Sequence, residues 1–252
     1  MEEEKIEALG MRLANRAYLY RLFHIVFGAE PSSEELAALG SPETVEAFRY
    51  LGEVTQAADA SISGVEGDSE QEASAAATIA KTVELAASLG KKANDVEYIE
   101  ALKSDFTRLF LVPGKAYVYP WESPYIGKEV MLFQESTLDV RNRYAEYGFA
   151  AVEFGHFPED HVSMMLDFLA HLSTRAFDAF GDERDDEVAK ILSSQKDFIA
   201  AHLVDWLADF HEDLCKKDSE EVFSTFAEAL RAFLALDGRF IEETLSEELT
   251  LP

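Results

Sequence analysis

The chain has 252 residues, of which 48% are hydrophobic, and its 49 aspartates and glutamates outnumber 22 lysines and arginines, giving a formal net charge of −27. This length and apolar content are enough for a substantial core, in one large domain or two small ones. A charge of this sign argues against nucleic acid or an anionic membrane as partner, because both need a basic surface, and it suits a cationic partner.

The beginning of the chain has the apolar periodicity of helices. Apolar residues recur at helical spacing over 11–27, which predicts an amphipathic helix that ends at Gly28. Ser32 and Glu35 have the spacing of a capping box, so a short helix is expected from there to Gly40.

The next elements are a helix, a loop and two further helices. Proline is tolerated in the first turn of a helix, so a helix is expected to begin at Pro42. Residues 59–69 offer little that could be buried and are expected to form a loop. Capping patterns then predict an alanine-rich helix over 69–90 and another that starts at Asn94 and ends near Phe110.

Helical spacing continues through the second half, after a loop that contains Pro120 and Trp121. Four more helices are expected, over 128–147, 158–180, 185–210 and 219–236. Gly148 and Gly238 would end the first and the last of them. Because no segment shows the alternation of a strand, we expect an all-α bundle. It would be one domain, 1–252, with halves 1–118 and 119–252 that meet at the loop.

The single cysteine and the first residues indicate the compartment. Cys215 excludes an intramolecular disulfide and any metal cluster built on cysteine, which fits a reducing compartment. The acidic start lacks the basic and apolar regions of a signal peptide, and no apolar run approaches the roughly 18 residues of a membrane span. We therefore expect a cytoplasmic protein with no stable membrane insertion.

The sequence contains no common catalytic motif: no P-loop, GxGxxG turn, GxSxG elbow or HExxH pair occurs. His156, Asp160 and His161 could together hold a metal through nitrogen and oxygen ligands. Because these residues straddle a predicted helix start, their side chains would point in different directions. We expect no catalytic residue, no metal and no cofactor, and a metal-dependent enzyme is the weaker alternative.

Two residues each have a structural and a functional interpretation. Asp160 falls in the first turn of the helix predicted from Pro158, where the helix dipole stabilises a carboxylate by typically ~0.3–1 kcal/mol. A carboxylate beside a pocket could instead bind an arginine side chain through two parallel hydrogen bonds. Trp121 could fill the core at a chain reversal, or it could anchor a bound peptide.

Five blocks, in order along nearly the whole chain, resemble the TorD/DmsD family of redox-enzyme maturation chaperones. They are the opening helix over 16–27, Leu109-Phe110…Pro113-Gly114, Pro120-Trp121-Glu122-Ser123, Pro158-Glu159-Asp160-His161 and Phe198…His202-Leu203…Trp206. Each block alone is weak, whereas the set is fairly specific to the family.

The resemblance implies an all-helical chaperone that binds the twin-arginine signal peptide of a molybdenum oxidoreductase. It would hold the apoenzyme until the molybdopterin cofactor is inserted, before Tat export. The implied peptide-binding residues are Pro120, Trp121, Glu122, Ser123, Pro158, Asp160 and His161. Asp160 is the first choice for a contact with a leader arginine and Glu122 the next, while an apolar groove between helices would take the apolar stretch of the leader.

Two other functions stay open. One is a NarJ-type assembly chaperone for a cytoplasmic reductase subunit that lacks a signal peptide. The other is the metal-dependent enzyme built on His156, Asp160 and His161. A monomer and a domain-swapped dimer are both compatible with a two-lobed bundle.

Overall fold

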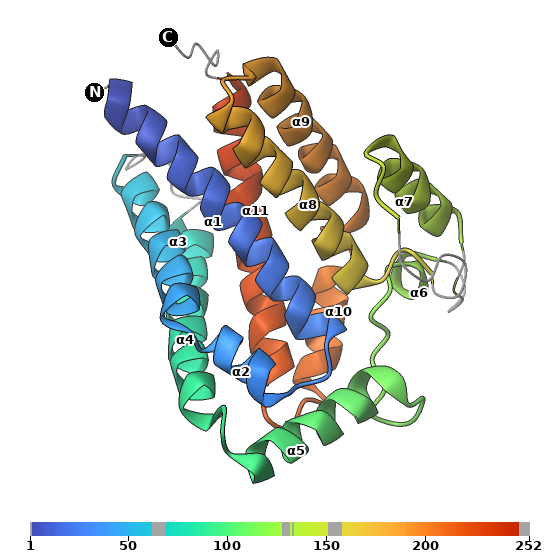
Figure 1. Cartoon of the computed structure of the whole chain (residues 1–252). Helices are drawn as coiled ribbons and strands as arrows, with labels where there is room; N and C mark the ends of the chain where they lie inside the picture. Colours follow the sequence, from blue (N-terminus) through green and yellow to red (C-terminus); the bar gives the residue numbers. More distant parts are fainter. Residues whose placement is uncertain (1, 62–68, 128–131, 133, 151–157, 247–252) are drawn as a thin grey trace. The chain divides into compact units, whose positions relative to one another are not determined.

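The computed structural model describes residues 2–61, 69–127, 132, 134–150 and 158–246. Within these residues every regular element is helical: eleven α-helices and one π-helical segment (Figure 1). The β-type pairing found there is a single isolated bridge between Trp121 and His161. The all-α class expected from the sequence is therefore confirmed. Among the described helices, none combines the length and hydropathy that a bilayer span requires.

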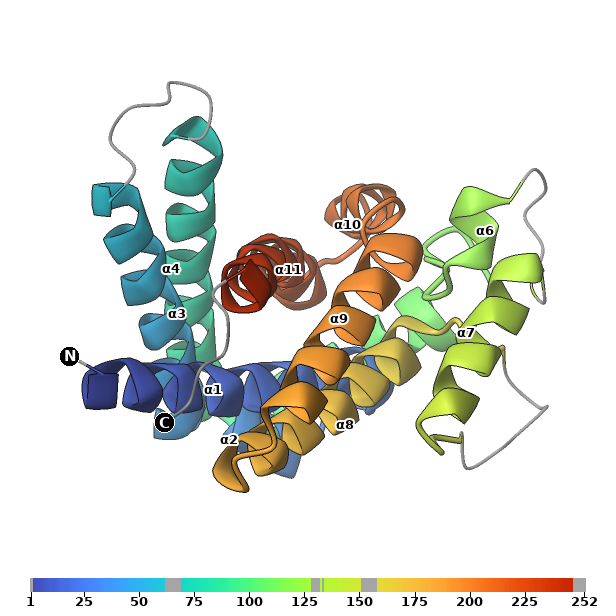
Figure 2. The same cartoon turned by 90° about the horizontal axis from the view of Figure 1, so that it is seen from above.

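The chain forms two compact units, and the first contains Met1–Gly28, Tyr119–Ala208 and Asp237–Pro252. Its helices are α1 (Glu2–Gly28), α6 (Ser123–Ile126), α7 (Glu135–Glu146), α8 (Val162–Gly181), α9 (Asp185–His202) and the end of α11 (Val222–Ser246). Figures 1 and 2 show α1 lying along α8, with α9 packed beside α8. The apolar face of α8 makes it the central helix of this unit, since most of its residues are buried.

A buried cluster of polar side chains joins α1, α9 and α11 within this unit. Arg16 in α1 donates to both carboxylate oxygens of Asp237 in α11, and to Oε1 of Gln195 in α9 at 2.9 Å. The hydroxyl of Tyr20 donates to the same Asp237 carboxylate at 2.6 Å. Arg16, Gln195 and Asp237 are buried. Further hydrogen bonds offset the cost of burying an ion pair, and Gln195 and Tyr20 supply such bonds here, while Nη1 of Arg16 has no hydrogen-bond partner among the described residues.

The second unit contains Ala29–Val118 and Asp209–Leu236. Its helices are α2 (Ser33–Leu39), α3 (Pro42–Ser61), α4 (Ser69–Lys92), α5 (Val96–Phe106), the π-helical η1 (Thr107–Leu111), most of α10 (Leu207–Cys215) and the first part of α11. Helices α3 and α4 lie side by side in both views (Figures 1 and 2). Phe110 in η1 packs edge-on against Phe223, with ring centroids 5.3 Å apart.

Two glycines let helices of the second unit touch backbone to backbone. A Cβ atom on Gly40, at the end of α2, would lie 2.0 Å from the backbone nitrogen of Gly90 in α4. A Cβ on Gly90 would lie 2.5 Å from the carbonyl oxygen of Gly40. The sequence prediction that Gly90 ends its helix is wrong, because α4 continues to Lys92. The role of Gly90 is to allow this close approach.

Several helix starts are confirmed or nearly so. Ser32 is the N-cap of α2 and accepts from the N–H groups of Glu34 and Glu35 at 3.2 Å, and α3 begins at Pro42. The helix predicted to start at Asn94 starts one residue later, because the carboxylate of Asp95 caps it. Of the predicted loop over 59–69, residues 59–61 belong to α3, residue 69 begins α4, and 62–68 lie outside the described residues.

Other boundaries in the second half are wrong for identifiable reasons. The helix predicted over 128–147 begins at Glu135 in the structure, and 128–131 and 133 lie outside the described residues. The helix predicted over 185–210 is interrupted after His202, whose carbonyl accepts the indole N–H of Trp206 at 2.7 Å. Gly238 lies inside α11, because burial of Phe240 and Ile241 outweighs the cost of a helical glycine, about 1 kcal/mol. The single domain with halves 1–118 and 119–252 stays a prediction.

Candidate functional site

The two motifs predicted to form a site come together in the first unit. Backbone N–H groups join the loop after Tyr119 to the segment before α8: Val162 donates to Pro120 O at 2.8 Å and Glu122 donates to Asp160 O at 3.1 Å. These two bonds form the bridge between Trp121 and His161. Residues 158–161 therefore pair with the loop and do not form the first turn of a helix. The predicted helix start at Pro158 is wrong, and α8 begins at Val162.

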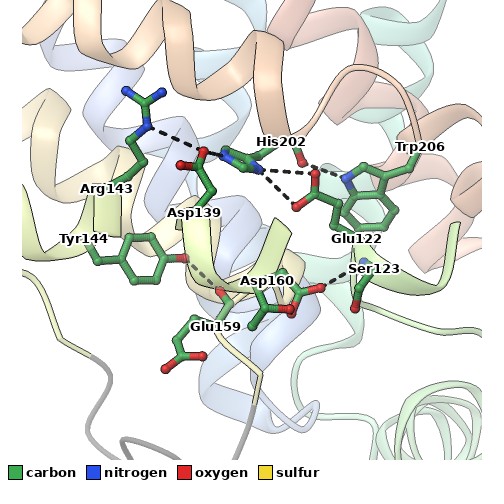
Figure 3. Close-up of polar contacts among 10 residues, drawn as sticks. Glu122, Ser123, Asp139, Arg143, Tyr144, Glu159, Asp160, His202 and Trp206 are labelled. Carbon is green, nitrogen blue, oxygen red and sulfur yellow. Dashed lines mark hydrogen bonds and ion pairs between the residues drawn. The ribbon is translucent and has the colours of Figure 1, made fainter. Parts of the chain in front are cut away.

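Asp160 anchors the tryptophan loop in the structure. Its side chain is fully buried, and its carboxylate accepts from the backbone N–H of Ser123 at 2.8 Å (Figure 3). The same carboxylate accepts from the hydroxyl of Thr137 at 3.0 Å. Both partners are neutral, and no ion pair of the described residues includes Asp160. Asp160 precedes the N-cap of α8, so it does not lie in the first turn of the helix as predicted.

The neighbouring His161 is the N-cap of α8. Its Nδ1 accepts the N–H of Ser163 at 3.1 Å, which requires an unprotonated Nδ1. Burial, followed by the charge of His24, lowers the pKa of His161 to about 4. The ring is therefore neutral at pH 7, and it meets the Trp121 ring edge-on at a centroid distance of 5.1 Å.

Trp121 and Ser123 each have a buried polar atom without a hydrogen-bond partner among the described residues. Trp121 is 8% exposed and Ser123 is fully buried. Within the described part of the chain, neither the indole N–H of Trp121 nor the hydroxyl of Ser123 has a hydrogen-bond partner. An unpaired buried polar group typically costs about 1–3 kcal/mol. The loop thus holds a buried donor that a bound chain could satisfy.

A second set of bonds ties the same loop to α7 and α9. Nδ1 of His202 lies 3.2 and 3.1 Å from the two carboxylate oxygens of Glu122, and its Nε2 lies 2.9 Å from the Asp139 carboxylate (Figure 3). Glu122 is 1% exposed and His202 is 4% exposed. The indole of Trp206 stacks on Tyr125 of the loop, with centroids 5.4 Å apart.

The charge states in this second set follow from its geometry. Burial lowers the pKa of His202, but hydrogen bonds and charges of Glu122 and Asp139 outweigh it, so the pKa is raised overall. Burial also raises the pKa of Glu122, and His202 offsets only part of this effect. A carboxylate faces each ring nitrogen, so this geometry favours the doubly protonated imidazolium form of His202.

Glu159 lies on the opposite side of α7. Its carboxylate receives two bonds from the Arg141 guanidinium, at 2.8 and 2.9 Å, and its carbonyl accepts the Tyr144 hydroxyl at 3.0 Å. Next to this pair is a pocket of about 270 Å³ with a largely apolar lining. It is lined by Arg141, Tyr144, Ala145, Gly148, Phe149, Ala150 and Glu159.

The residues of the metal-site alternative have other partners where they are described. His156 lies outside the described residues. Both oxygens of Asp160 accept hydrogen bonds, and Nδ1 of His161 caps α8. Within the ranges that the structure describes, no group of three His, Cys, Asp or Glu side chains could hold a metal ion.

The structure therefore brings the predicted peptide-binding residues together around one loop. Pro120 and Pro158 are buried beside the residues already described. Sequence reasoning missed Thr137, Asp139 and His202. His202 belonged to a quoted block but received no role, and Asp139 gave a weak signal as one of many acids, four residues before Arg143.

Comparisons with known proteins identify relatives of this chain. The family model described as nitrate reductase delta subunit matches residues 70–212. The chaperone protein TorD of Vibrio cholerae serotype O1 is 32% identical over 146 residues, 58% of this chain and 64% of that protein. The match thus spans less than two thirds of that relative. The TorD chaperone of Aliivibrio fischeri is 27% identical over 226 residues, 90% of this chain and 94% of that protein.

A solved structure from Archaeoglobus fulgidus, of a protein provisionally assigned to redox enzyme maturation, is also similar. It is 20% identical, with a TM-score of 0.45, and the alignment covers 87% of this chain and 93% of that one.

Proposed function

This chain belongs to the nitrate reductase delta subunit family, that of the TorD and NarJ chaperones, and we propose from this membership that it is a cytoplasmic chaperone of molybdoenzyme maturation. Its role is binding and not catalysis, in line with relatives that are named chaperones. The client is the apo-form of a molybdenum oxidoreductase, which the protein holds until the molybdopterin cofactor is inserted and Tat export follows.

The binding site for the client's twin-arginine signal peptide is the loop 120–123 with the segment 158–161. The observation that carries this proposal is Asp160, a fully buried carboxylate whose two hydrogen-bond partners are neutral. Buried charges in proteins are normally paired, so an unpaired carboxylate favours a cation. A guanidinium suits it, because it binds carboxylates through parallel hydrogen bonds.

The apolar part of the leader also has a candidate position. The pocket beside Tyr144 and Phe149 offers an apolar surface on the same helix, α7, that holds Asp160 through Thr137. A leader that follows α7 would therefore place its arginines near Asp160 and an apolar side chain in this pocket. The unpaired indole N–H of Trp121 would donate to a backbone carbonyl of the bound peptide.

The test is calorimetric titration of a synthetic peptide that has two adjacent arginines followed by an apolar stretch. We expect wild-type protein to bind it, and Asp160→Asn to weaken binding by about 2–5 kcal/mol, the usual cost of removing one partner of a buried charge pair. Asparagine is close to isosteric and can still accept from the N–H of Ser123, so the fold should persist.

The control variant is Asp167→Asn, which removes a half-buried carboxylate that pairs with Arg21 at 2.8 Å. It should leave binding unchanged. Equal affinity of wild type and Asp160→Asn, with melting curves showing both folded, would contradict the role of Asp160. No binding of the peptide by the wild type would contradict leader recognition itself.

A NarJ-type function is the second candidate, and the nitrate reductase delta subunit match favours it. In that case the client is a cytoplasmic reductase subunit without a leader. Co-purification with such a subunit, together with no binding of the arginine peptide, would select this function.

A further inference from the structure

The bridge between Glu122, His202 and Asp139 runs from the interior of the first unit to its surface. The Glu122 side chain is 1% exposed, that of His202 is 5% exposed and that of Asp139 is 48% exposed. Figure 3 shows the imidazole between the two carboxylates, with Arg143 on the outer side of Asp139. Arg143 Nε lies 3.7 Å from Asp139 Oδ2. A ligand can thus reach the bridge at Asp139, whereas the end at Glu122 is buried.

The imidazole of His202 bridges two carboxylates, as the guanidinium of an arginine side chain can. With both ring nitrogens protonated, it is a planar cation whose Nδ1 lies 3.1 Å from Glu122 and whose Nε2 lies 2.9 Å from Asp139. A guanidinium is also planar and has N–H donors that diverge, so it can bridge two carboxylates in the same way. Two carboxylates held apart by a planar cation are therefore a preformed guanidinium site.

We propose that Glu122 and Asp139 form an arginine-binding site that His202 occupies in the free protein, and that an arginine of the client's leader displaces it. This inference rests on the proposed function, and adds a second arginine site beside Asp160. The leader's two adjacent arginines then have two carboxylate positions, joined through neighbouring residues of one loop, since Ser123 holds Asp160 and Glu122 holds His202.

The exchange replaces one cation by another, which keeps its energetic cost low. Removing one partner of a buried ion pair is strongly destabilising because it leaves an uncompensated charge. A guanidinium that enters as His202 leaves keeps Glu122 paired throughout. His202 is the last residue of α9, where the helix gives way to a turn. Trp206 holds the carbonyl of His202 at 2.7 Å, so the movement is confined to the side chain.

Two substitutions of His202 should shift affinity in opposite directions. His202→Gln leaves the site without an internal cation, so the apparent affinity for a synthetic peptide with two adjacent arginines should rise about tenfold, or roughly 1.4 kcal/mol. His202→Arg places a permanent guanidinium between the carboxylates, so affinity should fall by about the same factor. Glu122→Gln, which removes the inner carboxylate, should also lower affinity. General loss of stability cannot produce opposite signs at one position.

The matched control is Tyr147→Phe. The hydroxyl of Tyr147, which follows α7, donates to the hydroxyl of Ser194 in α9 at 2.6 Å. The substitution removes this contact and leaves the bridge between Glu122, His202 and Asp139 intact. It should leave affinity unchanged. A peptide with lysines in place of both arginines should respond less to the His202 variants, because lysine cannot bridge two carboxylates through a planar fork.

A measurement on wild-type protein needs no variant. Displaced His202 returns to solvent, where the imidazole pKa is about 6.5, and loses its proton near neutral pH. Calorimetry in buffers of different ionisation enthalpy should therefore detect proton release on binding.

The outcomes separate the two hypotheses. A wild-type protein that binds the arginine peptide without proton release, with both His202 variants moving affinity in the same direction or not at all, would overturn this site alone. A wild-type protein that does not bind the peptide would overturn leader recognition, and the site with it.

Discussion

At the scale of single residues, three carboxylates of the candidate site are buried. Glu122, Glu159 and Asp160 are all at most 2% exposed. Two of them have a cation: His202 for Glu122 and Arg141 for Glu159. Asp160 has neutral partners only. A charge that only increased solubility would lie in water, so these three carboxylates have positioning or binding roles.

His202 should make stability depend on pH. Its folded-state pKa is raised, so its stabilisation is fully present below the unfolded value, about 6.5, and is lost as pH rises through the folded-state value. The pKa of Glu122 is also raised in the folded state, so its titration likewise lowers the free energy of unfolding as pH rises. We expect His202→Gln to lower the free energy of unfolding by about 1–3 kcal/mol near pH 6, and by much less near pH 9. Urea denaturation at both pH values measures this, and an equal loss at both would show that the imidazole charge is irrelevant.

Sequence alone could identify the site's motifs but not the state of their side chains. The Trp121 loop and the Asp160-His161 pair were both predicted, and the structure places them in contact. The partners of these residues come from α7 and α9, at sequence separations of 23 and 80. Side-chain bonds over such separations have no periodic signature, so Thr137 and His202 could not be assigned in advance.

At the scale of elements, the helices follow local patterns, while their ends follow tertiary contacts. Ser32 and Pro42 start helices as their types predict. The start of α8 moves from Pro158 to Val162, because the backbone of this segment pairs with the tryptophan loop. α11 continues through Gly238, because the residues after it are buried. The helix propensity of a single residue contributes little to the free energy of folding, so packing or backbone pairing that contributes a few kcal/mol determines where a helix ends.

The contact between α2 and α4 gives a prediction at this scale. Gly40→Ala would place a methyl 2.0 Å from the backbone of Gly90, so the helices must separate. We expect a loss of about 1–3 kcal/mol, the usual cost of overpacking. In Gly52→Ala the new methyl meets Ile79 at 3.4 Å, an ordinary contact, so this control in α3 should be neutral or slightly stabilising. Denaturant midpoints compare the two, and equal midpoints would refute the close approach.

At the scale of the whole molecule, the charge of −27 affects how a cationic peptide arrives. Affinity for the two-arginine peptide should fall as salt rises from about 0.01 M, where the Debye length is about 30 Å, to about 1 M, where it is about 3 Å. The fall should be partial, because buried pairs and apolar contacts are screened little. A peptide with glutamines in place of both arginines should show a weaker dependence. Titration at several salt concentrations tests this, and an unchanged affinity would show that the acidic surface plays no part.

The bond between Arg16 and Asp237 also determines when the first unit can form during synthesis. Its two partners are 221 residues apart. Ribosomes add roughly 5–20 residues per second, so Arg16 waits about 10–40 s before its partner has been made. During this interval α1 has emerged without the carboxylate that neutralises it. The buried ion pair that joins α1 to α11 therefore forms only after Asp237 has been made, later than every residue of the tryptophan loop and of α8.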